Sequence, residues 1–479
     1  MIAAVLNDMP YRYNAVVELI RKRVDAGTLK VGDRLPSIRQ LSQLTGFSTV
    51  TIHHGYELLE SRGYCTARPR SGYYLTRISS ELGDFAQHAE NPADPISIGD
   101  FPQSLLLSWQ NRTLDSFGAP HPSGDLFDCA ELDRVMRRIL RRGKLPAKEA
   151  VLGDIDLRLQ IARRAAQRGI FTRYQDIIIT GSAMQSLDLC LDALTDSGDI
   201  VLVESPSYFP ALSRIKHRNL RVIEIYSHPR TGVDPDQFEY LVKNNKIRVA
   251  LLMANNHFPT GITYGEEGMK RVVAAAHKNN VTIIENDMLG DLSYGIRNPA
   301  SLKKFDSSET VLQFSSFECS LAPEYGLGWV IAGKHAQPIL AASYLGGYGI
   351  NDARMQQALA EYLMSHSQDR HLRRIRDTLA SRMERGLQLL AKRLPAGCSI
   401  SRPNGGCMCW IHAPQGFKSF SAAKALHKQR VSILPGPVFS AAARSFENSF
   451  ALNFSFPWTA TNEAKIGKIA DFVAEITIG

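Results

Sequence analysis

Hydroxyl and guanidinium side chains are concentrated within the first 75 residues of the chain. The hydroxyls belong to Ser48, Thr49 and Thr51. The guanidinium groups flank them on both sides, at Arg34, Arg39, Arg68 and Arg70. Groups of these two kinds donate hydrogen bonds to phosphates and to the edges of bases. Their types and spacing therefore indicate a surface that binds a polyanion.

Two predicted helices precede the hydroxyl cluster. Tyr13, Val16, Val17, Ile20 and Val24 recur at helical spacing, which predicts an amphipathic helix that ends near Gly27. Ser37 to Gln40 form a capping-box pattern, so a second helix is expected to begin there and to stop at Gly46. Leu41 and Leu44 are expected on the buried face of this second helix.

A third helix and a hairpin complete this part of the chain. Ser48 is placed to cap the third helix, and Ile52, Tyr56 and Leu59 give it one apolar stripe. Its hydroxyls would then lie at an exposed N-terminus, where a recognition helix meets DNA. The residues from Tyr64 to Leu75 are typical of a β-hairpin with a basic tip at residues 68–72.

The ordered set of elements resembles the GntR family of winged-helix regulators. The resemblance is carried by Asp33-Arg34-Leu35-Pro36-Ser37-Ile38-Arg39 and by Tyr56-Glu57-Leu58-Leu59-Glu60. It implies a double-stranded DNA operator as partner. By the same resemblance, Arg34 and Arg39 would hold phosphates or a guanine edge, and Arg68 and Arg70, with Gly72 in the wing, would reach the minor groove or the backbone.

Composition and charge agree with a DNA partner. Lys and Arg number 56 against 47 Asp and Glu, a formal charge of +9. Residues 1–80 contain 11 basic and 6 acidic side chains, so +5 of the +9 lies in that segment. No apolar run approaches the roughly 18 residues of a membrane helix, and Met1 to Leu6 is too short for a signal peptide. Seven cysteines without CxxC pairing suit a reducing, cytoplasmic compartment.

The composition and the periodicity of the sequence change after Leu75. We predict a DNA-binding domain at 1–78, a polar linker at 79–109 and a large α/β domain at 110–479. In this last domain apolar strands alternate with amphipathic helices, which predicts a mostly parallel sheet covered on both faces. The strands are expected at 176–180, 200–204, 220–226, 249–255, 281–287, 311–317 and 329–332. Two long helices near 351–366 and 369–394 and a small C-terminal α/β subdomain from Cys398 follow.

The second domain resembles fold-type I pyridoxal-phosphate enzymes of the aminotransferase class. The resemblance rests on five stretches: Thr180 to Gln185, Glu204 to Tyr208, Pro259-Thr260-Gly261, Glu285-Asn286-Asp287 and Ser316 to Trp329. A GntR head joined to such a body is the architecture of MocR-type regulators. The resemblance implies a homodimer whose body senses a small-molecule effector while the heads grip paired DNA half-sites.

The key position of the aminotransferase pattern is changed in this chain. The family holds the cofactor aldehyde as an imine on the lysine of a Ser-x-Ser-Lys-x-Leu-x-Pro stretch. This chain has Cys319 at the lysine position of Ser316-Phe317-Glu318-Cys319-Ser320-Leu321-Ala322-Pro323. A thiol cannot form the imine through which amino groups are exchanged. We therefore expect no covalent cofactor link at Cys319.

Three further family positions are changed in the same direction. Asn286 stands where the resemblance places an Asp that faces the pyridine nitrogen. Asp287 would face the other way on a strand, unless a register shift brings it to that position. Gly326 stands at the position of a phosphate-binding Arg, and Ala451 at that of an Arg for the substrate carboxylate. Losing the Lys and the phosphate Arg removes about 3–6 kcal/mol of charged hydrogen bonding.

The cofactor pocket is expected to keep two features of the family: a weak phosphate site and an aromatic side chain that could stack on the cofactor ring. The turn Ser182-Ala183-Met184 can offer backbone donors at a helix N-terminus, and Tyr208 can stack on a ring or belong to the core. Pyridoxal phosphate is thus expected to bind without a covalent link or not at all. Trp410 and Phe454 are interpreted as core residues.

No other lysine is expected to replace the missing cofactor-binding lysine, and no metal site is expected. Lys303, Lys304 and Lys334 are interpreted as solvated charges at the ends of elements. Cys407-Met408-Cys409 is interpreted as a strand rather than a metal site. The sequence thus favours a DNA-binding regulator with a catalytically inactive aminotransferase-like body. The alternative is a bifunctional regulator that keeps pyridoxal-phosphate binding and transaminase-type activity.

Overall fold

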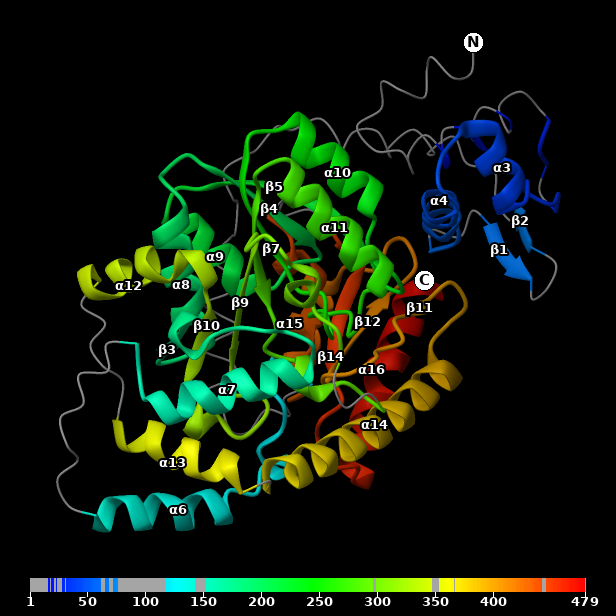
Figure 1. Cartoon of the computed structure of the whole chain (residues 1–479). Helices are drawn as coiled ribbons and strands as arrows, with labels where there is room; N and C mark the ends of the chain where they lie inside the picture. Colours follow the sequence, from blue (N-terminus) through cyan, green and yellow to red (C-terminus); the bar gives the residue numbers. More distant parts are fainter. Residues whose placement is uncertain are drawn as a thin grey trace.

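The structure is a computed structural model in which a small head and a large body follow one another along the chain (Figure 1). It describes residues 16–17, 19–20, 23, 28–30, 32–61, 65–68, 72–75, 117–142, 152–295, 299–346, 353–365, 367–441 and 445–478. The predicted linker at 79–109 lies outside the described residues, as do Tyr13 and Val24 of the predicted first helix.

The head contains the elements that the sequence predicts. Its elements are α3 (Ile38–Thr45), α4 (Thr49–Ser61), β1 (Cys65–Arg68) and β2 (Gly72–Leu75), with helical backbone also at 16–17, 19–20 and 23. β1 and β2 pair antiparallel, which confirms the hairpin. The capping box is also confirmed, because the Ser37 hydroxyl accepts from the Gln40 N–H while the Gln40 side chain accepts from the Ser37 N–H. Gly46 ends α3 in the left-handed conformation, with φ 73°.

One apolar core holds the head together. Val16, Leu41 and Ile52 are fully buried in it. The prediction that Leu44 is buried is wrong, because this side chain is 53% exposed in the last turn of α3. Phe47, beyond the end of that helix, joins the core instead.

A large mixed sheet forms the centre of the body. Its spatial order is β3-β10-β9-β8-β7-β4-β5-β6. The strands are β3 (Ile177–Thr180), β4 (Ile200–Ser205), β5 (Arg221–His228), β6 (Gly232–Val233), β7 (Ile247–Leu252), β8 (Thr282–Asn286), β9 (Val311–Ser316) and β10 (Gly328–Ile331). The neighbours from β5 through β9 run parallel, whereas β10 is antiparallel to both β3 and β9. The predicted mostly parallel sheet is confirmed.

Helices surround this sheet, and the last two of the body, α15 (Ser419–Lys428) and α16 (Ala460–Ile478), pack with the small C-terminal sheet described below (Figure 1). The others are α6 (Ala130–Arg141), α7 (Ile155–Gln167), α8 (Ala183–Leu194), α9 (Phe209–His217), α10 (Pro235–Asn244), α11 (Glu266–Lys278), α12 (Ala336–Leu345), α13 (Ala353–Met364) and α14 (Ser367–Arg393). Short 3-10 turns lie at η3 (Gly124–Leu126), η4 (Tyr174–Asp176), η5 (Gly290–Leu292), η6 (Leu302–Phe305), η7 (Pro323–Tyr325), η8 (Gly333–His335) and η9 (Gly436–Phe439).

The two faces of the sheet pack against different helices, because successive strand residues point to opposite sides. Val201 and Val203 of β4 belong to a buried cluster with α8 and α9, whereas Leu202 between them belongs to a cluster with α10 and α11. At the β3–β10 end, a third cluster joins the face opposite α8 to α6, α7 and α13. The sheet is therefore covered on both faces, as predicted.

A second, smaller sheet lies in the C-terminal part. Its order is β11-β12-β14-β13, with β11 (Ser399–Ile400), β12 (Met408–His412), β13 (Leu434–Pro435) and β14 (Ser449–Asn453). Trp410 and Phe454 are buried, which confirms them as core. In the part of the chain that the structure describes, no helix is long and apolar enough to cross a membrane.

Candidate functional site

Three of the predicted DNA-binding residues line one hollow on the head. Arg34, Arg39 and Gly72 surround a space of about 280 Å³ beside the first turn of α3. Both arginines are exposed. Gly72 has φ 100°, and a Cβ there would lie only 3.3 Å from Arg34 Nε, so a residue without a side chain suits this position. The hollow combines two cations with a helix N-terminus, a combination that attracts phosphate.

The basic tip of the wing is described only in part. The backbone of Arg68 ends β1 opposite Gly72. Arg70 lies outside the described residues. The predicted contacts of these two arginines with DNA therefore stay predictions.

The start of the recognition helix α4 differs from the expectation at one hydroxyl. Ser48 caps the helix, since its Oγ accepts from the Thr51 N–H at 3.1 Å, and Thr49 is exposed. Thr51, expected on an exposed end, is instead fully buried. Its hydroxyl donates to Asp236 Oδ2 at 3.0 Å, which joins the head to the first turn of α10 in the body. The expectation of an exposed Thr51 is therefore wrong for this arrangement of the two parts.

Asp236 is held ionised by its neighbours. Burial would raise the pKa of its carboxyl, but hydrogen bonds from Arg271, Ser48 and Thr51 outweigh that effect and leave the pKa below its ordinary value. Arg271 also forms an ion pair with Asp236. The start of α4 thus meets a carboxylate at the place where a recognition helix would meet a phosphate.

In the body, the loop after β9 and the start of α8 meet at the expected phosphate position. Ser182 caps α8 by accepting from the Gln185 N–H, and Ala183 and Met184 form the first turn. The Ala183 N–H and the Ser316 hydroxyl both lower the pKa of the Glu318 carboxyl, which therefore lies at this helix N-terminus. The chain therefore places its own anion on this helix N-terminus.

Gly326 provides the space for Glu318. A Cβ at Gly326 would lie 2.6 Å from Glu318 Cγ, so an arginine at 326 and the observed Glu318 position exclude one another. Burial raises the pKa of Glu318, while the bonds from Ala183 and Ser316 oppose the rise. The resemblance implies an arginine at position 326. The Glu318 carboxyl group occupies that space instead and interacts with the Ala183 N–H.

Cys319 is buried and inert as a nucleophile. Its side chain is 3% exposed, and burial together with the neighbouring Glu318 raises the pKa of its thiol to about 12. Thiol reactivity requires the thiolate, which is suppressed here near neutral pH. Cys319 packs in the apolar cluster on the α8 side of the sheet.

Aromatic rings pack together beside Cys319. The Tyr208 ring meets the Phe258 ring edge-on at a centroid distance of 5.4 Å, and Phe258 lies 5.8 Å from Phe439. Burial and the nearby Cys319 and Glu318 raise the pKa of the Tyr208 hydroxyl. Tyr208 is thus near Glu318 and Cys319, as the resemblance implies, but its ring is engaged by other aromatic side chains.

Asn286 and Asp287 separate as predicted. Asn286 ends β8, is buried, and its Oδ1 accepts from the Met288 N–H at 3.1 Å. Asp287 instead forms a two-pronged ion pair with Arg168, which lies just after α7 on the opposite face of the sheet. The Asp287 carboxylate therefore does not lie on the Cys319 side of the sheet, where it could face a pyridine nitrogen.

The alternative lysines are all committed elsewhere. Lys303 is not solvated as predicted, because its Nζ lies 2.9 Å from the buried Asp306 carboxylate and its side chain is 10% exposed. The Nζ of Lys304 donates to Glu266, and that of Lys334 to the Ser308 carbonyl. Each of these three lysines thus has a partner away from Cys319.

Two further expectations concern cysteines and a lost arginine. Cys407 and Cys409 are buried, and β12 begins at Met408, so the predicted strand is confirmed for Met408 and Cys409 while Cys407 directly precedes it. Ala451 is fully buried on β14. Among the residues that the structure describes, no group of three or more His, Cys, Asp or Glu side chains could hold a metal ion.

Sequence reasoning missed three functional residues. Glu318 stands at the second serine of the family stretch, and this change together with Gly326 was an available signal for a substituted anion site. Phe258 directly precedes the Pro259-Thr260-Gly261 stretch, and its position next to this stretch was the available signal. The pairing of Asp236 with Thr51 joins residues 185 positions apart and had no local signal.

Comparison with family models divides the chain into the same two parts. Residues 12–75 match the model of bacterial regulatory proteins of the gntR family. Residues 147–456 match the model of aminotransferase class I and II.

Similar proteins share both parts or the body alone. The chain is 30% identical to the uncharacterized HTH-type transcriptional regulator YdcR of Escherichia coli, over 97% of this chain and 99% of that one. It is 24% identical to the HTH-type transcriptional regulator NorG of Staphylococcus aureus, over 92% and 100% of the two chains. Kynurenine aminotransferase of Pyrococcus horikoshii has a similar fold, with a TM-score of 0.72, 22% identity, and coverage of 83% of this chain and 98% of that one.

Proposed function

We propose that this chain, which belongs to the gntR family of bacterial regulatory proteins and carries an aminotransferase class I and II body, regulates transcription with its head while its body performs no aminotransferase chemistry. The head would bind double-stranded DNA through the hollow lined by Arg34 and Arg39 and through the start of α4. Phosphate contacts of this kind set register, and a few side chains select sequence.

One observation carries the proposal for the body: the Glu318 side chain occupies the space beside Gly326, and its carboxyl interacts with the Ala183 N–H at the start of α8. A phosphate bound there would have to displace this carboxylate or lie beside it, and two anions repel one another at short range. The residues present therefore do not fit pyridoxal phosphate.

Cys319 supports the same conclusion from the aldehyde end of the cofactor. A buried thiol with a pKa raised to about 12 offers neither an amine nor a thiolate. Lys303, Lys304 and Lys334 are engaged with other groups, so none of them is a ready replacement.

We further propose that the protein is a cytoplasmic homodimer. We place the chain in the cytoplasm, because all seven of its cysteines are free thiols, as is usual in a reducing compartment. A homodimer would give two heads for paired half-sites of an operator. A small-molecule effector would act by binding two arrangements of the dimer with different affinity.

The cofactor proposal is tested on the purified full-length protein. Pyridoxal phosphate is titrated in while the absorption spectrum is followed, and the mixture is reduced with borohydride and weighed by intact mass spectrometry. We expect no saturable imine band and no one-to-one adduct at equimolar cofactor. A reducible one-to-one adduct mapped to a single lysine would overturn the proposal and favour the bifunctional alternative.

The DNA proposal is tested with a duplex selected by the protein from a random-sequence pool. Arg39→Ala should weaken binding and lower the slope of log affinity against log salt by about one. Arg141→Ala, which removes an exposed arginine of α6 in the body, is the matched control. Unchanged binding by the Arg39 variant would contradict the proposed docking face.

A further inference from the structure

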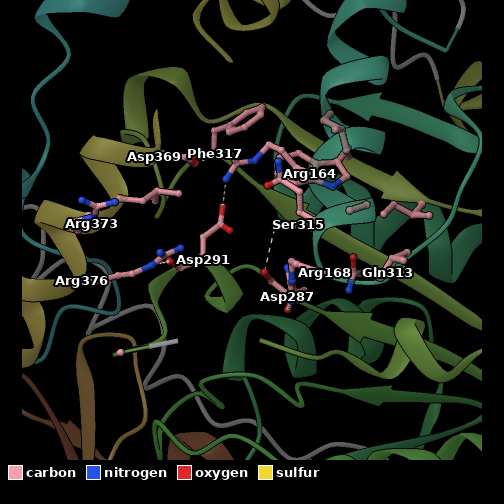
Figure 2. Close-up of a pocket in the computed structure, with 18 of the residues that line it drawn as sticks. Arg164, Arg168, Asp287, Asp291, Gln313, Ser315, Phe317, Asp369, Arg373 and Arg376 are labelled. Atoms are coloured by element: carbon pink, nitrogen blue, oxygen red, sulfur yellow. Dashed lines mark hydrogen bonds and ion pairs between the residues drawn. The ribbon is translucent and has the colours of Figure 1, made fainter. Parts of the chain in front are cut away.

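A cleft of about 250 Å³ opens on the face of the large sheet opposite Cys319 (Figure 2). Gln313 and Ser315 of β9 and Trp329 of β10 line it, whereas Phe314 and Val330 point to the other face. Helices α7 and α14 contribute to its lining as well. The cleft is thus built by the strands that lead to Cys319 but is separated from that residue by the sheet.

Part of the charge in the cleft is already neutralised. Arg168 is paired with Asp287, and both side chains are largely buried. Arg164 lies 3.5 Å from Asp291 and 4.0 Å from Asp369 (Figure 2). These pairs hold α7, the end of β8 and α14 together around the cleft.

Two charged groups on α14 remain uncommitted. Arg373 and Asp377, one turn apart, are exposed at the cleft and have no partner among the residues that the structure describes. Arg376 lies between them along the helix, and its Nε donates to the Asp291 carbonyl at 2.6 Å, which holds its guanidinium at the cleft. Figure 2 shows Arg373 and Arg376 on the same side of the cleft. An incoming molecule therefore meets two guanidinium groups and one carboxylate.

An aromatic surface lies among the apolar lining residues. Phe317 and Trp329 pack with their ring centroids 4.7 Å apart, and Trp329 is partly exposed. Both residues line the cleft. A flat ring stacks favourably on such a surface, and the exposed guanidinium group of Arg373 beside it provides orientation.

We propose that this cleft binds a small molecule that carries both an aromatic ring and a carboxylate. The carboxylate would pair with Arg373 and Arg376, since guanidinium groups bind carboxylates in a two-pronged manner. The ring would lie against Trp329. An ammonium group on the same molecule would face Asp377. The volume, near the lower end of the usual range for ligand sites, suits a molecule of amino-acid size.

The binding test needs no DNA, so it can fail independently of the proposed regulatory function. The probes are 4-fluorophenylacetate, 4-fluorophenylalanine and 4-fluorophenethylamine, the last of which lacks the carboxylate, and binding is followed by fluorine NMR. We expect the two carboxylates to bind and the amine to bind at least about tenfold more weakly, because it forfeits a charged pair. Equal binding of all three, or binding of none up to millimolar concentration, would overturn the proposal.

The variants locate the site. Arg373→Gln should weaken binding of 4-fluorophenylacetate at least about tenfold. Arg370→Gln, one turn earlier on α14 and outside the cleft lining, should leave it unchanged. If both variants lose affinity equally, or neither does, the carboxylate does not bind at Arg373.

A separate observation concerns the contact between head and body. Thr51, at the start of the recognition helix, donates to Asp236 at 3.0 Å, and Ser48 hydrogen-bonds to the same carboxylate. Figure 1 shows α4 as the helix of the head that is closest to the body. We infer that Asp236 imitates a DNA phosphate and holds the recognition helix in a state that excludes DNA. This inference rests on the proposed DNA-binding function.

Two experiments test the docked state. Asp236→Asn should tighten binding of the selected duplex by about tenfold, a typical size for a coupling between sites. Glu239→Gln, on the next turn of α10, should change nothing. A disulfide between Thr51→Cys and Asp236→Cys should abolish DNA binding until it is reduced. If Asp236→Asn leaves DNA affinity unchanged, or if the oxidised protein still binds DNA, the docked state does not exclude DNA.

Discussion

Removing the Glu318 carboxylate should strengthen binding of the cofactor phosphate in a protein whose lysine has been restored at position 319. The perturbation is the double variant Cys319→Lys/Glu318→Ser, compared with Cys319→Lys alone. In the single variant the amine is present, but the Glu318 carboxyl still interacts with the Ala183 N–H. In the double variant that N–H is released for a phosphate oxygen.

The size of the difference follows from the contact that is freed. A hydrogen bond to a charged group contributes about 1.5–3 kcal/mol. Returning the Ala183 N–H to the phosphate therefore tightens pyridoxal phosphate by about one to two decades in Kd. Repulsion between carboxylate and phosphate acts in the same direction, so this difference is a lower bound.

The assay follows the imine band during titration with pyridoxal phosphate, and borohydride reduction then identifies the modified lysine by mass. The matched control is Cys319→Lys/Glu324→Ser, which removes an exposed carboxylate from the same loop. This control should behave like the single variant. Equal cofactor affinity in all three variants would refute the assignment of Glu318 as the group that occupies the phosphate position.

Three further predictions concern stability. Burial raises the pKa of Glu204 from 4.5 to about 8, so between these values the folded protein keeps a proton that the unfolded chain releases. The free energy of unfolding should therefore fall with rising pH across that window, by about 1.4 kcal/mol per pH unit, and a pH series of urea denaturation should be flatter for Glu204→Gln. Asp287→Ala leaves Arg168 buried without its partner and should cost about 3–5 kcal/mol in the same assay, and a loss below 1 kcal/mol would contradict the ion pair. Ser37→Ala removes the cap of α3 and should speed amide hydrogen exchange in that helix, as expected for about 1 kcal/mol, whereas unchanged exchange would show that the cap is dispensable.

Elements specified by local patterns could be predicted from the sequence. The capping box at Ser37, the stop at Gly46 and the strand positions of the large sheet depend on nearby residues, and they agree with the structure. The burial of Leu44 was wrong because a helical period gives the direction of a side chain but not the extent of the core around it.

The candidate site was predictable only where one residue changes the chemistry by itself. The replacement at Cys319 is such a case. The role of Glu318 depends on the space that Gly326 leaves and on a donor at the start of α8, which come together only in the folded chain. The cleft beside Trp329 likewise combines two strands with two helices that are distant in sequence.

The contact between Thr51 and Asp236 has a consequence that concerns the chain between the two parts. Head and body are covalently joined through residues 76–116, so each surface meets the other at an effective concentration that the length of this segment sets. For tethered partners this concentration is on the order of millimolar for short flexible connections and falls as the tether lengthens. A contact too weak to hold two separate molecules together can thus be well populated within one chain. Lengthening or cutting residues 76–116 would then change DNA affinity while both contacting surfaces stay intact.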